Sequence, residues 1–176
     1  MKDTVKPIAV LAGICLVVTA LLAYINLITS PIISAAEEKA ASEARSEVLA
    51  EANGEFEKLE DVELPEGVTE AYRGSGNSGY VFMLSQKGYG GEIKLICGIK
   101  SDGSIEAIKT LSHSETSGIG SKVVDNGSGY RDKFKGKTED DYSEVDAISG
   151  ATISSTAYKK AIASAFEAYD MVKGAD

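Results

Sequence analysis

The sequence predicts an α+β fold that follows a single N-terminal transmembrane helix. Three observations support this. An uncharged, largely apolar stretch runs from Pro7 to Ala36. Short apolar stretches separated by turn residues occupy the middle of the chain, a pattern typical of an antiparallel sheet. From about Ile153 the apolar residues recur at helical spacing. The 176 residues are enough for one globular domain beyond the membrane segment.

The apolar segment is long enough to cross a bilayer. Only Gly13, Thr19 and Asn26 interrupt the stretch from Ile8 to Ile28, and a transmembrane helix needs about 20 predominantly apolar residues. A cleavable signal peptide is the alternative, because Ser34-Ala35-Ala36 offers small residues for cleavage. The apolar region of a signal peptide is typically about 7–15 residues, so we expect a retained anchor.

The basic residues predict the orientation of this anchor. Lys2 and Lys6 precede the span, and the first basic residue after it is Lys39. Basic residues flanking a span favour the cytoplasmic side. We therefore expect a single-pass protein of the cell membrane, with a cytoplasmic N-terminus and an extracytoplasmic domain.

A helical stalk is predicted between the span and the domain. Pro31 marks the exit from the membrane helix, and the Ala- and Glu-rich segment Glu37–Ala52 favours helix. Asn53-Gly54 is a typical helix end. The expected organisation is a cytoplasmic N-terminus (1–6), a transmembrane helix (7–29), a stalk helix with linker (30–60) and an extracytoplasmic domain (61–176).

An antiparallel meander of about four strands is expected in this domain, with flanking helices. The expected strands are Val68–Tyr72, Tyr80–Leu84, Ile93–Ile99 and Ile105–Leu111, with one more short strand at Val145–Ile148. A loop-rich segment, 112–138, follows the meander. The buried stripe of the C-terminal helix is expected to consist of Ala157, Ala161, Ile162, Ala165, Phe166, Tyr169 and Val172.

Charge and cysteine content exclude several classes of function. The formal net charge of −9 argues against nucleic acid and anionic lipid as partners. Cys15 lies in the span and Cys97 in the domain, so we expect no disulfide between them. Without a Cys/His cluster, no metal site is predicted. Cys97 lies in an apolar strand and is expected to be a small buried residue.

Two glycine-containing segments resemble nucleotide-binding motifs but lack the context that those motifs need. Gly74–Gly79 matches G-x-G-x-x-G, yet the apolar segment after it predicts a strand where a dinucleotide site needs a helix. We expect a hairpin turn there. Gly136-Lys137-Thr138 resembles the end of a P-loop, but the position that requires the first glycine is Arg131.

The segment Asp146–Thr152 (DAISGAT) precedes the long C-terminal helix. The first N–H groups of a helix have no partner within it and attract anions, so this is a favourable place for a phosphate. Ser149 adds a hydroxyl group, and Gly150 and Ala151 leave room for close approach to the backbone. A helix start capped by Ser or Thr is the alternative interpretation.

This segment resembles the flavin acceptor sequence of the FMN-binding domain family, D-x-x-S/T-G-A-T. In that family, a separate flavin transferase joins the last Thr to FMN through a phosphoester bond. The resemblance implies that Thr152 carries covalent FMN and makes the chain a phosphoprotein in that sense. The other FMN-binding residues expected here are Ser149, Gly150, Ala151, Ile153 and Ser154.

A second segment, Glu115–Gly120 (ETSGIG), is similar to the E-T-P-G-L-G segment of the same family, which lies against the flavin ring. Glu115, Thr116, Gly118 and Ile119 are therefore expected to contact the flavin. Ser117 and Ile119 depart from the family's Pro and Leu. Weaker similarities are found at 87–91 and 134–137.

One span, a stalk and one such domain resemble the G subunits of Rnf complexes. These complexes move electrons between ferredoxin and NAD and pump ions. The resemblance implies an electron carrier without catalytic side chains of its own, with other Rnf-type subunits as partners. The alternatives are the C subunit of Na⁺-translocating NADH:quinone reductase, a stand-alone flavin relay and a tethered domain without redox function. His113 and Lys122 could act on the flavin or only stabilise the loop and the surface.

Overall fold

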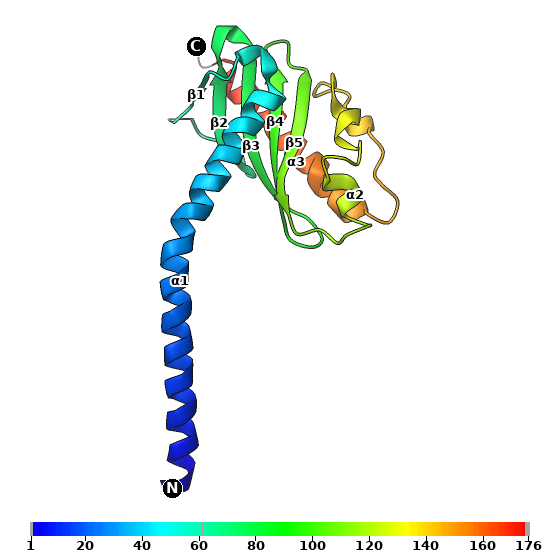
Figure 1. Cartoon of the computed structure of the whole chain (residues 1–176). Helices are drawn as coiled ribbons and strands as arrows, with labels where there is room; N and C mark the ends of the chain where they lie inside the picture. The colour runs from blue at the N-terminus through cyan, green and yellow to red at the C-terminus, as the bar shows by residue number, and fades with distance from the viewer. Residues whose placement is uncertain (1, 61, 175–176) are drawn as a thin grey trace. The chain divides into compact units, whose positions relative to one another are not determined.

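The computed structural model describes residues 2–60 and 62–174. The predicted domain boundaries at 61 and 176 lie outside these ranges. The chain divides after Ala40 into two compact units. Helix α1 (Lys2–Val48) contributes to both units, and the globular unit holds the sheet and the remaining helices (Figure 1).

Helix α1 begins with the apolar segment. Within the described residues it is the one helix long and apolar enough to cross a membrane. The sequence predicted separate membrane and stalk helices, with Pro31 marking the exit from the first. The structure instead joins them into one helix with Pro7 and Pro31 inside it. An interior proline costs one hydrogen bond and favours a bend, but it does not always end a helix. Helix α1 ends at Val48, before the predicted end at Ala52. The separate short helix η1 (Ala50–Ala52) follows and ends at Asn53-Gly54, where both residues have positive φ angles.

The sheet has five antiparallel strands in sequence order. They are β1 (Phe56–Lys58), β2 (Val68–Gly74), β3 (Gly79–Lys87), β4 (Glu92–Lys100) and β5 (Ile105–His113). The four expected strands are confirmed, and β1 is an addition that the sequence analysis missed. The short helix η2 (Ser75–Asn77) joins β2 to β3, so the G-x-G-x-x-G segment forms the predicted hairpin connection.

The expected strand at Val145–Ile148 is wrong. Helix η4 (Tyr142–Glu144) ends just before it, and the residues up to Ile148 pair with no strand. Val145 packs into the core instead. Part of the outer edge of β5 is hydrogen-bonded to a loop instead, because Ile105 exchanges backbone hydrogen bonds with Gly136 and Lys137.

Helices cover both faces of the sheet (Figure 1). On one face, α3 (Thr152–Val172) packs against Phe82, Leu95 and other core residues, and its predicted apolar stripe is buried. On the other, Ala44 and Val48 near the end of α1 pack against Val81 and Ile96. Strands buried on both faces have nearly continuous apolar sequences, as β3 and β4 do.

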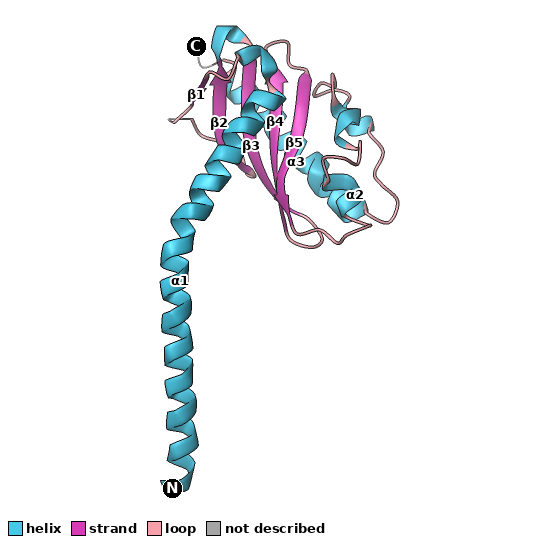
Figure 2. Cartoon of the chain, viewed as in Figure 1, coloured by secondary structure: helices cyan, strands magenta, loops and turns pink. Residues whose placement is uncertain are grey.

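The connection between β5 and α3 is mostly loop (Figure 2). It contains the short helices α2 (Ser121–Val124), η3 (Arg131–Phe134) and η4. Tyr130 and Phe134 from this connection pack edge-to-face and contact Tyr158 of α3. This aromatic cluster fixes the loop against the helix. Cys97 is fully buried as predicted, and burial raises the pKa of its thiol to about 12.

We expect Gly98→Ala to destabilise the globular unit. A Cβ atom at Gly98 would overlap the backbone carbonyl of Val48, so the end of α1 would have to move off the sheet. The expected loss is about 1–3 kcal/mol in the free energy of unfolding, measured by chemical denaturation of the full chain in detergent.

Gly127→Ala is the matched control, because a Cβ there meets no atom within 4 Å. Equal stability of the two variants would contradict the close approach of α1 to the sheet.

Candidate flavin site

The start of α3 is shaped by a tight turn. The Ala151 N–H donates to the Ile148 carbonyl at 2.9 Å, and Gly150 takes φ +81° within this turn, a conformation that favours glycine. The buried Ser155 hydroxyl accepts a hydrogen bond from the Ile148 N–H at 3.1 Å. Ala151 occupies the N-cap position of α3 and offers no side-chain cap. The first N–H groups of α3 are therefore open to an anion.

The segment Glu115–Gly120 lies beside this helix start. Its turn is closed by the Ser121 N–H, which donates to the Thr116 carbonyl at 3.2 Å. The Ser121 hydroxyl accepts a hydrogen bond from the Gly118 N–H at 2.9 Å. Ser121 thus holds the turn from both sides, although the family's proline is absent at Ser117.

The Glu115 carboxylate connects three segments. Its Oε2 accepts a hydrogen bond from the Ser154 hydroxyl at 2.6 Å, and its Oε1 accepts one from the Gly90 N–H at 3.1 Å. The side chain is buried. Hydrogen bonds to a buried carboxylate are stronger than those between neutral groups. Glu115 therefore joins its own loop to the β3–β4 hairpin and to the first turn of α3.

Glycines make room for this carboxylate. A Cβ atom at Gly88 or Gly120 would overlap a Glu115 carboxylate oxygen, and one at Gly90 would overlap the Ser114 carbonyl. The hairpin segment Lys87–Gly91 is consequently glycine-rich because the Glu115 loop packs directly against it.

His113 links the Glu115 loop to Asp125 through hydrogen bonds. Its Nδ1 accepts a hydrogen bond from the Glu115 N–H at 3.3 Å, and its Nε2 lies 3.0 Å from Asp125 Oδ1. Because Nδ1 accepts, Nε2 carries the proton that is donated to Asp125. Neither His113 nor Lys122 is among the residues that line the cleft described next.

These segments enclose a cleft of about 440 Å³, here called the apolar cleft. It is lined by Tyr89, Glu115, Thr116, Ile119, Gly120, Gly150, Ala151, Thr152, Ile153 and Ser154. Three large apolar side chains at this cleft are exposed: Tyr89 by 72%, Ile119 by 53% and Ile153 by 58%. In the described part of the globular unit, Met171 is the one other large apolar residue that is exposed in this way. Such a cluster is typical of a surface that binds a ligand or a partner.

Comparison with known proteins identifies the family. Residues 88–167 match the FMN-binding domain family, and this range includes every residue that lines the apolar cleft. The chain is 34% identical to the G subunit of the ion-translocating oxidoreductase complex of Methanosarcina acetivorans, over 94% of each chain. The chain belongs to the family of G subunits of Rnf-type ion-translocating oxidoreductase complexes.

Two further G subunits are also similar to this chain. The G subunit of the Na⁺-translocating ferredoxin:NAD⁺ oxidoreductase complex of Acetobacterium woodii is 31% identical, over 84% of this chain and 83% of that protein. The G subunit of the ion-translocating oxidoreductase complex of Shewanella oneidensis is 39% identical over 45% of this chain, but the match covers only 42% of that relative's length.

Most residues that the sequence assigned to the flavin lie at the apolar cleft. Ser149 and Gly118 are the exceptions among them, since neither lines it. Conversely, Tyr89 and Gly120 line the cleft without having been named as site residues. The weak similarity at 87–91 was the signal that could have identified Tyr89.

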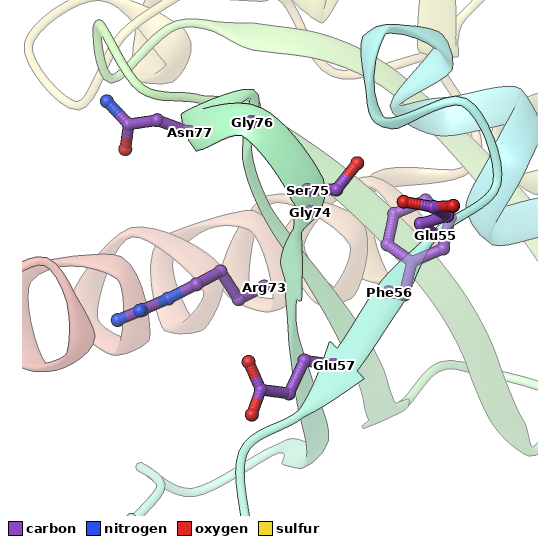
Figure 3. A pocket seen from close by; sticks show the side chains of 8 residues that line it. All are labelled: Glu55, Phe56, Glu57, Arg73, Gly74, Ser75, Gly76 and Asn77. Carbon is purple, nitrogen blue, oxygen red and sulfur yellow. The ribbon is translucent and has the colours of Figure 1, made fainter.

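A different pocket, of about 420 Å³, lies where β1 meets the β2–β3 connection (Figure 3). Its lining includes Glu55, Glu57, Arg73 and Asn77. Figure 3 shows their polar ends pointing in different directions, without convergence on one point. A specific ligand site needs a few polar groups that converge, so this pocket is not the candidate site.

We expect Glu115→Ala to loosen the site. The Gly90 N–H and the Ser154 hydroxyl would lose their acceptor, at a cost of about 2–3 kcal/mol in the free energy of unfolding. Glu115→Gln should cost less, because the amide can accept from one partner and donate to the Ser154 oxygen. Denaturant unfolding of the full chain in detergent measures both.

Thr116→Ala removes an exposed side chain of the same turn and should change stability by less than about 0.5 kcal/mol. If Glu115→Ala were no more destabilising than this control, the carboxylate would not hold the three segments together.

Proposed function

We propose that this protein is the electron-carrying subunit of a membrane-bound ferredoxin:NAD oxidoreductase complex that translocates ions. FMN linked to Thr152 by a phosphoester bond would be its redox group. The observation that carries the proposal is the position of Thr152 at the uncapped start of α3, within a cleft where exposed Tyr89, Ile119 and Ile153 gather.

The residues present fit FMN. The volume of about 440 Å³ is in the usual range for small-molecule sites. Tyr89, Ile119 and Ile153 offer apolar surface for a flat aromatic ring, and the first N–H groups of α3 suit a phosphate. Thr152 is exposed, so a separate flavin transferase could reach its hydroxyl group.

Bound FMN would supply reversible uptake and release of electrons, chemistry that belongs to the cofactor. The protein's own residues would bind the flavin, orient it and partly exclude water from it. The Glu115 carboxylate already has both oxygens hydrogen-bonded within the protein. Its role is therefore to position the cleft rather than to transfer protons, and the chain would act as a carrier for partner subunits of the complex.

The proposed location is the cell membrane, with the flavin domain on the extracytoplasmic side. The length and composition of α1 support a membrane span, and Lys2 and Lys6 before the span support a cytoplasmic N-terminus. A covalent bond suits this side, because a dissociated cofactor would be lost from the cell.

Thr152→Val should abolish covalent flavin. The wild-type full chain should gain the mass of one FMN less one water, and its denatured gel band should fluoresce under ultraviolet light. The variant should show neither, while circular dichroism reports an unchanged fold.

Thr156→Val is the matched control, since Thr156 is also exposed one turn further along α3. Flavin retained in Thr152→Val would refute the assignment of Thr152. A wild-type chain without flavin, isolated from cells that make the transferase, would instead favour a tethered domain without redox function.

Cysteine labelling tests the orientation. The native cysteines should not be labelled, because Cys15 lies in the proposed span and Cys97 is buried, with the pKa of its thiol raised to about 12. On intact cells, a membrane-impermeant maleimide should label Asp140→Cys in the exposed loop of the domain.

Val5→Cys is the counterpart at the other end of the span and should be labelled only after the cells are permeabilised. The reverse pattern would place the domain in the cytoplasm.

A further inference from the structure

A second cleft adjoins Thr152 on the side away from the Glu115 loop. It has a volume of about 530 Å³ and is here called the lysine cleft. Its lining consists of Glu66, Gly67, Ser85, Gln86, Lys87, Thr152, Ile153, Thr156, Ala157 and Lys160. Thr152 and Ile153 line both clefts. A group attached to the Thr152 oxygen would therefore lie at the junction of the two.

The two clefts differ in charge. Among the described residues that line the apolar cleft, Glu115 alone carries a charge, and it is negative. The lysine cleft contains Lys87 and Lys160 beside a single acid, Glu66. A like charge repels a phosphate and an opposite charge attracts it. The phosphate end of a ligand at Thr152 is thus favoured on the lysine side.

The helix directs Lys160 toward Thr152. Thr152, Thr156 and Lys160 follow one another at four-residue spacing on α3, so they share one face of the helix. Helical side chains lean toward the N-terminus, which brings the Lys160 ammonium group back toward Thr152. Lys87, the last residue of β3, also lines this cleft.

The ammonium groups of Lys87 and Lys160 are free to bind an anion. Within residues 2–60 and 62–174, the side chains of Lys87 and Lys160 form no ion pair or hydrogen bond with the protein. Lys58, Lys109 and Lys137, by contrast, are each paired with a glutamate or aspartate. Two unpaired cations in one cleft make its surface locally positive in a chain of net charge −9.

We propose that Lys87 and Lys160 bind the phosphate that links the flavin to Thr152, and so direct the flavin ring into the apolar cleft. This inference rests on the proposed function. A phosphodiester keeps one negative charge, which two lysines can hold as point charges. The lysines then act as positioning residues: they restrict rotation of the linker, while Tyr89, Ile119 and Ile153 contact the ring.

Time-resolved fluorescence anisotropy of the covalent flavin tests this in the full-length protein in detergent. Lys87→Gln and Lys160→Gln should each lower the ratio of immobilised to freely rotating flavin by about 1.4- to 5-fold, the range for a single exposed ion pair. The double variant should lose more than either single variant. About 1 M salt, where the Debye length is about 3 Å, should lower the ratio of immobilised to freely rotating flavin in the wild type. The same salt should leave that ratio unchanged in the double variant.

Lys135→Gln is the matched control. It removes the same charge from an exposed residue in the connection between β5 and α3 that lines neither cleft. Anisotropy of the double variant equal to that of Lys135→Gln would overturn the inference and leave the flavin assignment intact. A wild-type chain without flavin would overturn both.

Discussion

Both oxygens of the Glu115 carboxylate accept hydrogen bonds from segments distant in sequence. Gly90 is 25 residues away and Ser154 is 39 residues away. This pair of hydrogen bonds fixes the distance between the β3–β4 hairpin and the start of α3, and the apolar cleft is the space between them. The absence of side chains at Gly88 and Gly120 follows from this constraint, because any Cβ there would displace the carboxylate.

The second constraint is that the sheet is covered on both faces. Helix α3 buries one face, and its first residues form the site. The end of α1 buries the other face, where Gly98 permits contact with the Val48 carbonyl. The end of α1 is therefore packed on the same sheet that positions the apolar cleft.

Much of the fold could be predicted from local patterns. The four central strands and the buried stripe of α3 were evident in the sequence because burial imposes apolar residues there. Strand β1 was missed, since Phe56–Lys58 has one apolar residue and depends on pairing with β2. Thr152 was assigned from a motif, but the contribution of Tyr89 and the linking role of Glu115 depend on contacts between segments far apart in the chain. Local spacing contains no information about those contacts.

Tandem mass spectrometry of the tryptic peptide 138–159 tests the central claim most directly, because that peptide contains both Thr152 and Thr156. Fragment ions of the peptide from the native protein should place the mass of FMN less one water on Thr152. The same mass on Thr156 or on a serine of the peptide, or on a different peptide, would contradict the account of the apolar cleft as the flavin site.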